Sequence, residues 1–357
     1  MGQINRSGSQ RVQGGHLLAQ QRFLGFLRSM SPRIRADFSK FRRLGTGRCA
    51  ALMEESINGG GLSRQLPAAV KRYVWSARVG DFAILAPIPL LGFAYGIQSV
   101  TLTNVFTGAE IAVASLLLLV HIFALNDWAD YDADLGAHPL GDPVQASRNS
   151  LLLVAIIALG CSIVLLWSIW PPALVPAAFV ITASAIYSLQ WPMRGKEVLL
   201  LSSALHAICG ATYFLLGLSM AAGFSTRWSS VWVFLGLSMA AGHMHQEISD
   251  HREDLASRAR THATVLGPYK TFFLGQLTFA AAFLALVVLP GGAGSWLFQL
   301  LMVLAWAANV ALAIACWRDG LAAESVERYR SRYRWLYVLI GLGLLLRTPA
   351  VQQLVNF

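Results

Sequence analysis

Residues 105–134 read VFTGAEIAVASLLLLVHIFALNDWADYDAD. The part that ends at Asn126 is largely apolar and, at about 1.5 Å per residue, is long enough for a helix that crosses a hydrocarbon core of about 30 Å. The remainder is rich in aspartate. We therefore expect a membrane helix that ends in a dense acidic cluster at the membrane surface. The acids of this cluster are Asp127, Asp130, Asp132 and Asp134.

Long apolar segments of this kind recur along the chain. Of its 357 residues, 55% are hydrophobic and 13% are charged, whereas a soluble domain carries about 25% charged residues. We predict an all-α, polytopic membrane protein with about nine transmembrane helices around a central chamber. The expected spans are 80–98, 105–126, 150–169, 172–189, 198–219, 229–246, 271–289, 294–316 and 334–350.

The first 75 residues are expected to form a basic, polar leader, and residues 76–357 the membrane domain. The leader contains no apolar segment of the kind found in signal peptides. Two interpretations stay open for it. One is a flexible or surface-lying amphipathic tail that contacts anionic lipid, and the other is an organellar transit peptide.

The net charge of +10 follows the predicted topology. With the N-terminus inside, every Lys and Arg except Arg227 and Arg347 falls in the leader or in the loops after even-numbered spans. The positive-inside rule then places these segments in the cytoplasm. No nucleic-acid motif accompanies the basic excess, so we expect no nucleic-acid partner. Because Arg greatly outnumbers Lys, we expect a bacterial cell membrane, with an organellar membrane as the alternative.

The acids of the first cluster are spaced so that three of them share one face of a helix. At about 100° per residue, Asp127, Asp130 and Asp134 fall within a stripe of about 60°. Asp132 points to the opposite side of the same helix.

A second acidic run, EISDHRED at residues 247–254, follows the sixth expected span. Glu247, Asp250 and Asp254 repeat the spacing of the first stripe, and Glu253 lies off it. Both runs are expected at the cytoplasmic ends of membrane helices. Acids at helix C-termini oppose the macrodipole, so stability alone does not favour them there. A functional reason is therefore the better explanation.

Three carboxylates on one stripe repel each other unless a cation binds between them. Mg²⁺ is typically bound in proteins by one or two carboxylates together with substrate phosphates. Two facing stripes are expected to hold two or three Mg²⁺ ions, or Mn²⁺, and a diphosphate. That arrangement suits the ionisation of an allylic diphosphate, because the metal neutralises charge on the leaving group. The alternative for each run is a solvated acidic loop.

The pattern Asn126-Asp127-x-x-Asp130-x-x-x-Asp134, followed by the second run, resembles the UbiA superfamily of intramembrane prenyltransferases. The resemblance covers about residues 76–350. It includes the segment YSLQWPMRGK at 187–196 and the segment RART at 258–261. It implies transfer of an isoprenoid group from a prenyl diphosphate to an acceptor, most often an aromatic or quinone precursor, with release of diphosphate. The implied partners are this donor, a small-molecule or lipid acceptor and membrane lipid.

The resemblance also implies roles for individual residues. Asn126 would bind the donor, and Lys196 and Arg194 would contact its diphosphate, although both cations also fit ordinary positive-inside anchoring. The implied catalytic residues are Asp127, Asp130, Asp250 and Lys196. The implied metal ligands are Asp127, Asp130, Asp134, Glu247, Asp250 and Asp254.

Three further residues are weaker candidates for substrate binding. Tyr187 would hydrogen-bond phosphate or stack on substrate, or else is a plain interfacial aromatic. Arg148 is a candidate phosphate contact, because the stretch 136–143 lacks the Arg-Pro pair of many family members. Asp81 is a candidate acceptor-side contact, or a local ion-pair partner of Arg78.

Several histidines also lie within or beside the expected spans. His243 and His245 lie about 200° apart on a helix, which favours packing over metal binding. His121 and His206 are candidates to line the substrate chamber, because ionisable groups in membrane helices tend to face cavities.

Three other functions remain open. A phosphoribosyl diphosphate could lose diphosphate over the same carboxylates with a polyprenyl phosphate as acceptor, and a prenyl cation could cyclise internally. A cation-coupled transporter is disfavoured, because it would place its acids near the midplane rather than at one interface. The sequence does not indicate the acceptor, the donor chain length or the oligomeric state.

Overall fold

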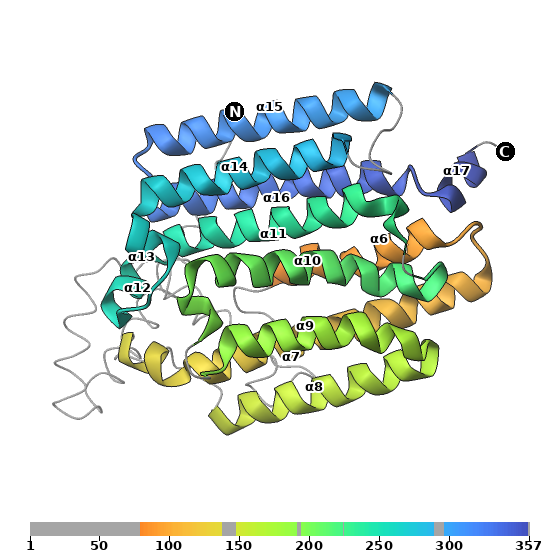
Figure 1. Ribbon diagram of the computed structural model, residues 1–357, viewed down its shortest axis with the longest axis horizontal. Coiled ribbons are helices and arrows are strands. Elements are labelled where there is room, and N and C mark those ends of the chain that lie inside the picture. Colours follow the sequence, from red (N-terminus) through yellow and green to blue (C-terminus); the bar gives the residue numbers. More distant parts are fainter. Residues whose placement is uncertain (1–78, 138–147, 191–193, 224, 289–295, 356–357) are drawn as a thin grey trace, which may run out of the picture. The chain divides into compact units, whose positions relative to one another are not determined.

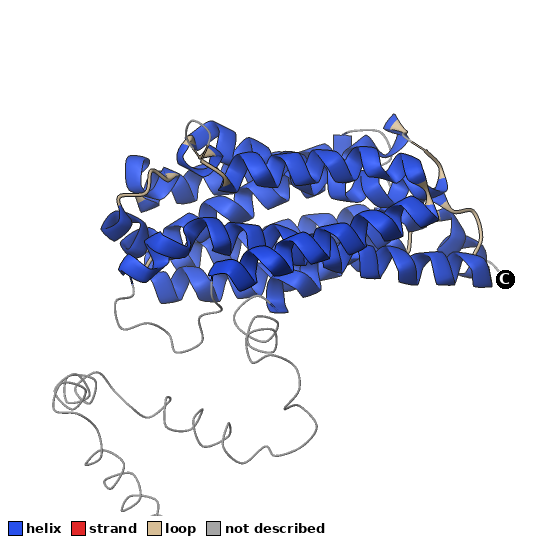
Figure 2. Ribbon diagram, turned by 90° about the horizontal axis from the view of Figure 1, so that it is seen from below, coloured by secondary structure: helices blue, strands red, loops and turns tan. Residues whose placement is uncertain are grey.

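The computed structural model describes residues 79–137, 148–190, 194–223, 225–288 and 296–355. Side chains are described for these residues except at 79–81, 132–137 and 354–355. The leader, residues 1–75, lies outside the described residues. Within them all regular elements are helices, as Figure 2 shows, which confirms the predicted all-α class.

The long helices run side by side, and their connections gather at two ends (Figures 1 and 2). Among the described residues, six helical segments are long and apolar enough to cross a membrane, over α7, α8, α9, α10, α14 and α15. The helices are α5 (Val79–Leu85), α6 (Pro87–Gly96), α7 (Leu102–Ala137), α8 (Arg148–Ile169), α9 (Leu174–Ser188), α10 (Leu199–Ala221), α11 (Ser229–Ser249), α12 (His251–Ser257), α13 (His262–Leu266), α14 (Pro268–Val288), α15 (Trp296–Arg318), α16 (Ala323–Leu345) and α17 (Pro349–Val355).

Each expected span has a helix as its counterpart, but some boundaries differ. The first span is divided between α5 and α6, where Pro87 begins the second helix because proline lacks the N–H that would continue the first. The last span was expected to begin at residue 334, whereas α16 begins at Ala323. Hydropathy detects only the apolar part of this helix, since its first half is rich in arginine.

The two acidic runs differ from each other in backbone structure. The first run is helical, because α7 continues through it to Ala137. The second run is divided, because α11 ends at Ser249 and α12 begins at His251. The three acids of the second run therefore do not share one continuous helix.

Close helix packing fixes the helices that carry the second run. A Cβ atom at Gly217 of α10 would lie 1.7 Å from the Pro89 carbonyl oxygen of α6, and one at Gly236 of α11 would lie 2.6 Å from the Ala207 carbonyl oxygen of α10. Small residues let membrane helices approach this closely. Phe214 and Phe234 are fully buried in the core beside these contacts. The helices α6, α10 and α11 thus form a tightly packed centre.

Candidate functional site

The first acidic run forms the last turns of α7. Because α7 is continuous from Leu102 to Ala137, Asp127, Asp130 and Asp134 lie on one helix, as the stripe prediction requires. Asp127 and Asp130 are half-buried. The side chains of Asp134 and Asp132 lie outside the described residues.

Asp130 is held by two cations from the segment that leads into α10. Arg194 Nη1 lies 2.6 Å from Asp130 Oδ1, and Lys196 Nζ pairs with the same oxygen. Arg194 also donates a hydrogen bond to the Ala129 carbonyl. Both cations are only about one-fifth exposed, at 18% and 22% of their side chains. The structure thus brings together three of the residues singled out in the sequence.

The end of α9 supplies two further contacts to this region. Ser188 Oγ donates a hydrogen bond of 3.4 Å to Asn126 Oδ1. The Tyr187 ring packs edge-on against the rings of His206 and His243, with centroid distances of 4.9 and 5.8 Å. Tyr187 is therefore half-buried and packs against helices α10 and α11.

The second acidic run reaches the first through α12. Helix α12 packs against α7, and in Figure 1 it lies at the end of the helices where α7 ends. The Tyr187 hydroxyl is close enough to interact electrostatically with carboxylates of both runs, namely Asp130, Glu247, Asp250 and Asp254. The two runs therefore lie close enough to form one acidic region.

Asp250, at the N-terminal boundary of α12, and Asp254, within α12, both have raised pKa values. Burial raises the pKa of Asp250, and the Arg330 guanidinium acts in the opposite direction. Burial raises the pKa of Asp254 to about 6, Thr261 opposes this shift through a hydrogen bond, and the charges of Asp250 and Glu247 add to it. Neighbouring like charges and burial both disfavour ionised carboxylates, so a bound cation would stabilise them.

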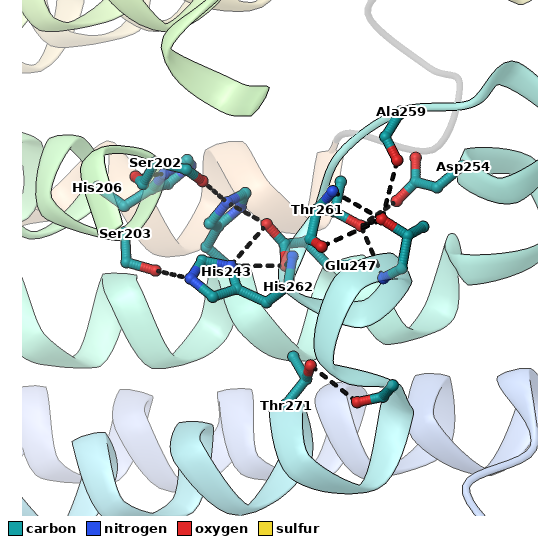
Figure 3. A network of polar contacts seen from close by, with 12 residues as sticks. Ser202, Ser203, His206, His243, Glu247, Asp254, Ala259, Thr261, His262 and Thr271 are labelled. Carbon is teal, nitrogen blue, oxygen red and sulfur yellow. Dashed lines mark hydrogen bonds and ion pairs between the residues drawn. The ribbon is translucent and has the colours of Figure 1, made fainter. Parts of the chain in front are cut away.

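Glu247 has different partners from those expected. Its side chain is buried, with 4% of the residue exposed. One oxygen lies 3.0 Å from His243 Nε2, and the other accepts from the His262 backbone N–H at 2.8 Å and from His262 Nδ1 at 2.9 Å (Figure 3). Glu247 was expected to bind metal beside Asp250 and Asp254. It lies instead against His243, one turn earlier on α11, and against His262 at the start of α13.

Comparison with known proteins identifies the family. The model of the UbiA prenyltransferase family matches residues 85–338. The chain belongs to this family. The protein is therefore a prenyltransferase of the membrane-helical UbiA type. No curated protein sequence matches the chain significantly.

Solved structures of UbiA homologues share the fold. A homologue from Archaeoglobus fulgidus, bound to GPP and Mg²⁺, is 17% identical with a TM-score of 0.57, over 77% of this chain and 99% of that one. An apo homologue from Aeropyrum pernix K1 is 17% identical with a TM-score of 0.59, over 76% and 98%. A digeranylgeranylglyceryl phosphate synthase is 13% identical with a TM-score of 0.58, over 80% and 100%.

The carboxylates of this UbiA-family protein fit a Mg²⁺ ion whose coordination shell is completed by substrate phosphate. Among the side chains that the structure describes, no three His, Cys, Asp or Glu residues converge as a ready-made metal site. Mg²⁺ characteristically takes only one or two carboxylates together with water and substrate phosphate. Half-buried carboxylates on α7 and α12 provide oxygen donors of this kind, with Arg194 and Lys196 beside them.

Two residues of the site were not singled out in the sequence. His262, at the start of α13, is one. The other is Arg330 of α16, whose side chain is 9% exposed and pairs with Glu327 at 2.8 Å. Arg330 Nη2 also donates to Gln246 Oε1 at 3.4 Å, and its charge acts on Asp250. The sequence of α16 gave no signal for this role, because Arg330 is one of several arginines in that helix.

Three of the remaining candidates make contacts of other kinds. Arg148 lies over the Trp128 ring, 5.1 Å from its centroid. His121 is buried against α8, with Nδ1 3.0 Å from the Ala155 carbonyl. His206 stacks on His243 with a centroid distance of 3.8 Å. The side chain of Asp81 lies outside the described residues.

Proposed function

We propose that the protein is a Mg²⁺-dependent intramembrane prenyltransferase that moves an isoprenoid group from a prenyl diphosphate to an aromatic or quinone precursor. The observation that carries this proposal is the meeting of Arg194 and Lys196 with Asp130 at the end of α7, against which the acidic α12 packs. Cations and carboxylates together suit a diphosphate with its metal ions. The Archaeoglobus fulgidus homologue bound to GPP and Mg²⁺ supports the donor class.

The acids of both runs divide the binding of metal between them. We assign Asp127, Asp130 and Asp134 to one side and Asp250 and Asp254 to the other, holding two or three Mg²⁺ ions or Mn²⁺. Bound Mg²⁺ would supply neutralisation of the charge on the diphosphate leaving group. Asn126 and Ser188 are linked by a hydrogen bond and would orient the donor beside the first run.

Arg194 and Lys196 are the protein's own donors to the leaving group. The allylic C–O bond breaks, its electron pair leaves with the diphosphate, and both side chains stabilise the new charge by charge-assisted hydrogen bonds. The allylic carbon then bonds to an electron-rich atom of the acceptor, which releases a proton. Apolar helices exclude water from the cation.

Other assignments extend this proposal. Tyr187 would contact phosphate or substrate between the two runs, Arg148 would contact phosphate, and Asp81 would contact the acceptor. We further propose a multi-pass protein of the bacterial cell membrane with a cytoplasmic N-terminus. In it residues 76–357 form the prenyltransferase domain, and residues 1–75 form the leader.

The test is a radiolabel assay of the purified full-length protein in lipid nanodiscs. Prenyl diphosphates of several lengths and phosphoribosyl diphosphate are supplied separately with aromatic and polyprenyl phosphate acceptors, in Mg²⁺ or in excess EDTA. We expect diphosphate release and a prenylated acceptor only with prenyl donors and metal. Release from phosphoribosyl diphosphate alone, a cyclised product formed without acceptor, or full turnover in EDTA would each contradict the proposal.

A further inference from the structure

Three hydrogen-bond donors from the protein itself surround the Glu247 carboxylate. An ionised carboxylate has about four lone-pair sites. Oε2 accepts from the His262 backbone N–H and from Nδ1 of the same residue, at 2.8 and 2.9 Å. Oε1 lies 3.0 Å from His243 Nε2 and 3.2 Å from His262 Nδ1. These contacts leave this buried carboxylate little capacity for a metal ion.

The two histidines connect Glu247 to helix α10. Ser202 Oγ lies 2.5 Å from His243 Nε2, and Ser203 Oγ lies 3.5 Å from His262 Nε2 (Figure 3). The pair of serines therefore presents one hydroxyl to each histidine. Buried polar networks hold a single arrangement when their members are satisfied. Glu247 lies at the centre of this one.

The same contacts close the loop that contains α12. After α11 ends at Ser249, the chain passes through α12 and comes back to α11 at His262. The contact between Glu247 and His262 joins the two ends of this segment. Next to His262, the Thr261 hydroxyl donates to Asp254 Oδ2 at 3.1 Å. The position of His262 therefore determines where Thr261 holds the Asp254 carboxylate.

The return turn needs such a closure, because its backbone is strained. Arg258 ends α12 with φ 59° and ψ 27°, in the left-handed region. A residue with a Cβ adopts this conformation at an energetic cost, and it persists where the surrounding structure determines it. Thr261 and Thr264 complete a capping box just after this turn.

We propose that Glu247 is a positioning residue and not a metal ligand. Through His262 it fixes the return of the chain at Thr261 and so orients Asp254 towards α7, while His243 ties the same carboxylate to α10. The second acidic run then offers Asp250 and Asp254 to metal, and Glu247 holds them in place. The reference to metal rests on the proposed function, whereas the anchoring contacts do not.

The test uses full-length Glu247→Gln and His262→Asn variants and the double variant, with Glu253→Gln as the matched control. Glu253 is an exposed acid of α12, so its replacement removes the same charge from the same run. The melting temperature is measured in EDTA. Trypsin cleavage after the exposed residues Arg258 and Arg260 is mapped by mass spectrometry under the same conditions. Mn²⁺ binding to each protein is measured separately by electron paramagnetic resonance.

If Glu247 is an anchor, each single variant should melt about 3–6 °C below the wild type in EDTA. Trypsin should also cut each of them faster after Arg258 and Arg260. The double variant should be little worse than either single variant, because both remove one interaction. Mn²⁺ affinity should fall about 10- to 100-fold in both single variants. The Glu253→Gln control should match the wild type in melting and cleavage.

The opposite pattern would overturn the proposal. If Glu247 is a ligand, Glu247→Gln should lose Mn²⁺ but melt in EDTA at or above the wild-type temperature, because one repelling charge is gone, and His262→Asn should behave as wild type. Should Glu247→Gln fail to fold, His262→Asn decides alone, since it keeps the carboxylate. None of these readouts requires a prenyl donor, so they remain informative if the proposed reaction is wrong.

Discussion

Asp130 and Glu247 are two acids of one site that the fold holds in opposite ways. Asp130 is half-buried at the end of α7 and is paired with the permanent cations Arg194 and Lys196. Glu247 is buried at the end of α11 and is enclosed by His243 and His262. One acid lies among charges that a phosphate can share. The other lies among hydrogen-bond donors that already occupy its oxygens.

The difference shows that spacing in a sequence does not determine the role of a carboxylate. Cations beside a half-buried carboxylate can turn towards an incoming diphosphate, because they gain a second anionic partner. A buried carboxylate with three donors loses those bonds if it moves, and buried groups without partners are destabilising. We therefore assign Asp130 to the reaction and Glu247 to the architecture.

The largest effect expected is the loss of activity in Asp130→Ala. This change removes a proposed metal ligand and the partner of both cations, so diphosphate release should fall by about 10²- to 10³-fold or more. Asp250→Ala should fall similarly, because it removes the corresponding ligand of the second run. Diphosphate release is measured at saturating Mg²⁺ and donor. Near-normal turnover in either variant would refute the metal assignment.

These two variants also sharpen the comparison with Glu247. Arg194 and Lys196 keep 18% and 22% of their side chains exposed, so water can reach both cations when Asp130 is removed, which limits the loss of stability. The melting temperature of Asp130→Ala in EDTA should therefore stay close to that of the wild type. A large drop would mean that Asp130, like Glu247, is an anchor.

The next effect in size concerns the cations. Lys196→Gln should lower kcat by about 10²-fold, because one donor to the leaving group is lost. Lys270→Gln is the matched control, since Lys270 is an exposed lysine of α14 outside the cluster. Initial rates over a range of donor concentrations separate kcat from KM. If Lys196→Gln and Lys270→Gln behave alike, Lys196 is only a topological anchor.

Much of this site could be predicted from the sequence. Apolar runs indicated the helices, and the acids at positions 127, 130 and 134 fall on one stripe because α7 continues unbroken through them. Arg194 was placed beside the acids by the family resemblance, and topology agreed with it, because positive charge fixes which loops share a membrane face. Its contact with Asp130 agrees with that argument.

The break at Asp250 could not be predicted in the same way. No Gly or Pro marks the break. Asp250 caps the C-terminus of α11, and its carbonyl accepts the first hydrogen bonds of α12. The turn at Arg258 has a left-handed conformation that glycine or asparagine usually signals. His262 meets Glu247 only because these two features return the chain to α11. Helical periodicity contains no information on such a return.

A smaller effect is expected at Arg330, which acts on the second run from α16. Arg330→Gln should reduce activity about 10-fold, because residues that orient ligands typically contribute 10- to 100-fold. Arg332→Gln, at an exposed position on the same helix, should retain wild-type activity. The comparison is made at several Mg²⁺ concentrations. We expect the Arg330 variant to need more Mg²⁺, and equal behaviour of the two variants would exclude its role.

The smallest effects should come from the acids that lie off the stripes. By helical geometry, position 132 lies about 200° from position 130 around the continuous helix α7, and Glu253 is exposed on α12. Substitutions at such positions usually change stability by no more than about 0.5 kcal/mol, so Asp132→Asn and Glu253→Gln should keep activity within about two-fold of the wild type. Asp130→Asn, which removes the same charge as Asp132→Asn, should lose far more. Equal losses in the two asparagine variants would mean that net charge, rather than the face of α7, determines activity.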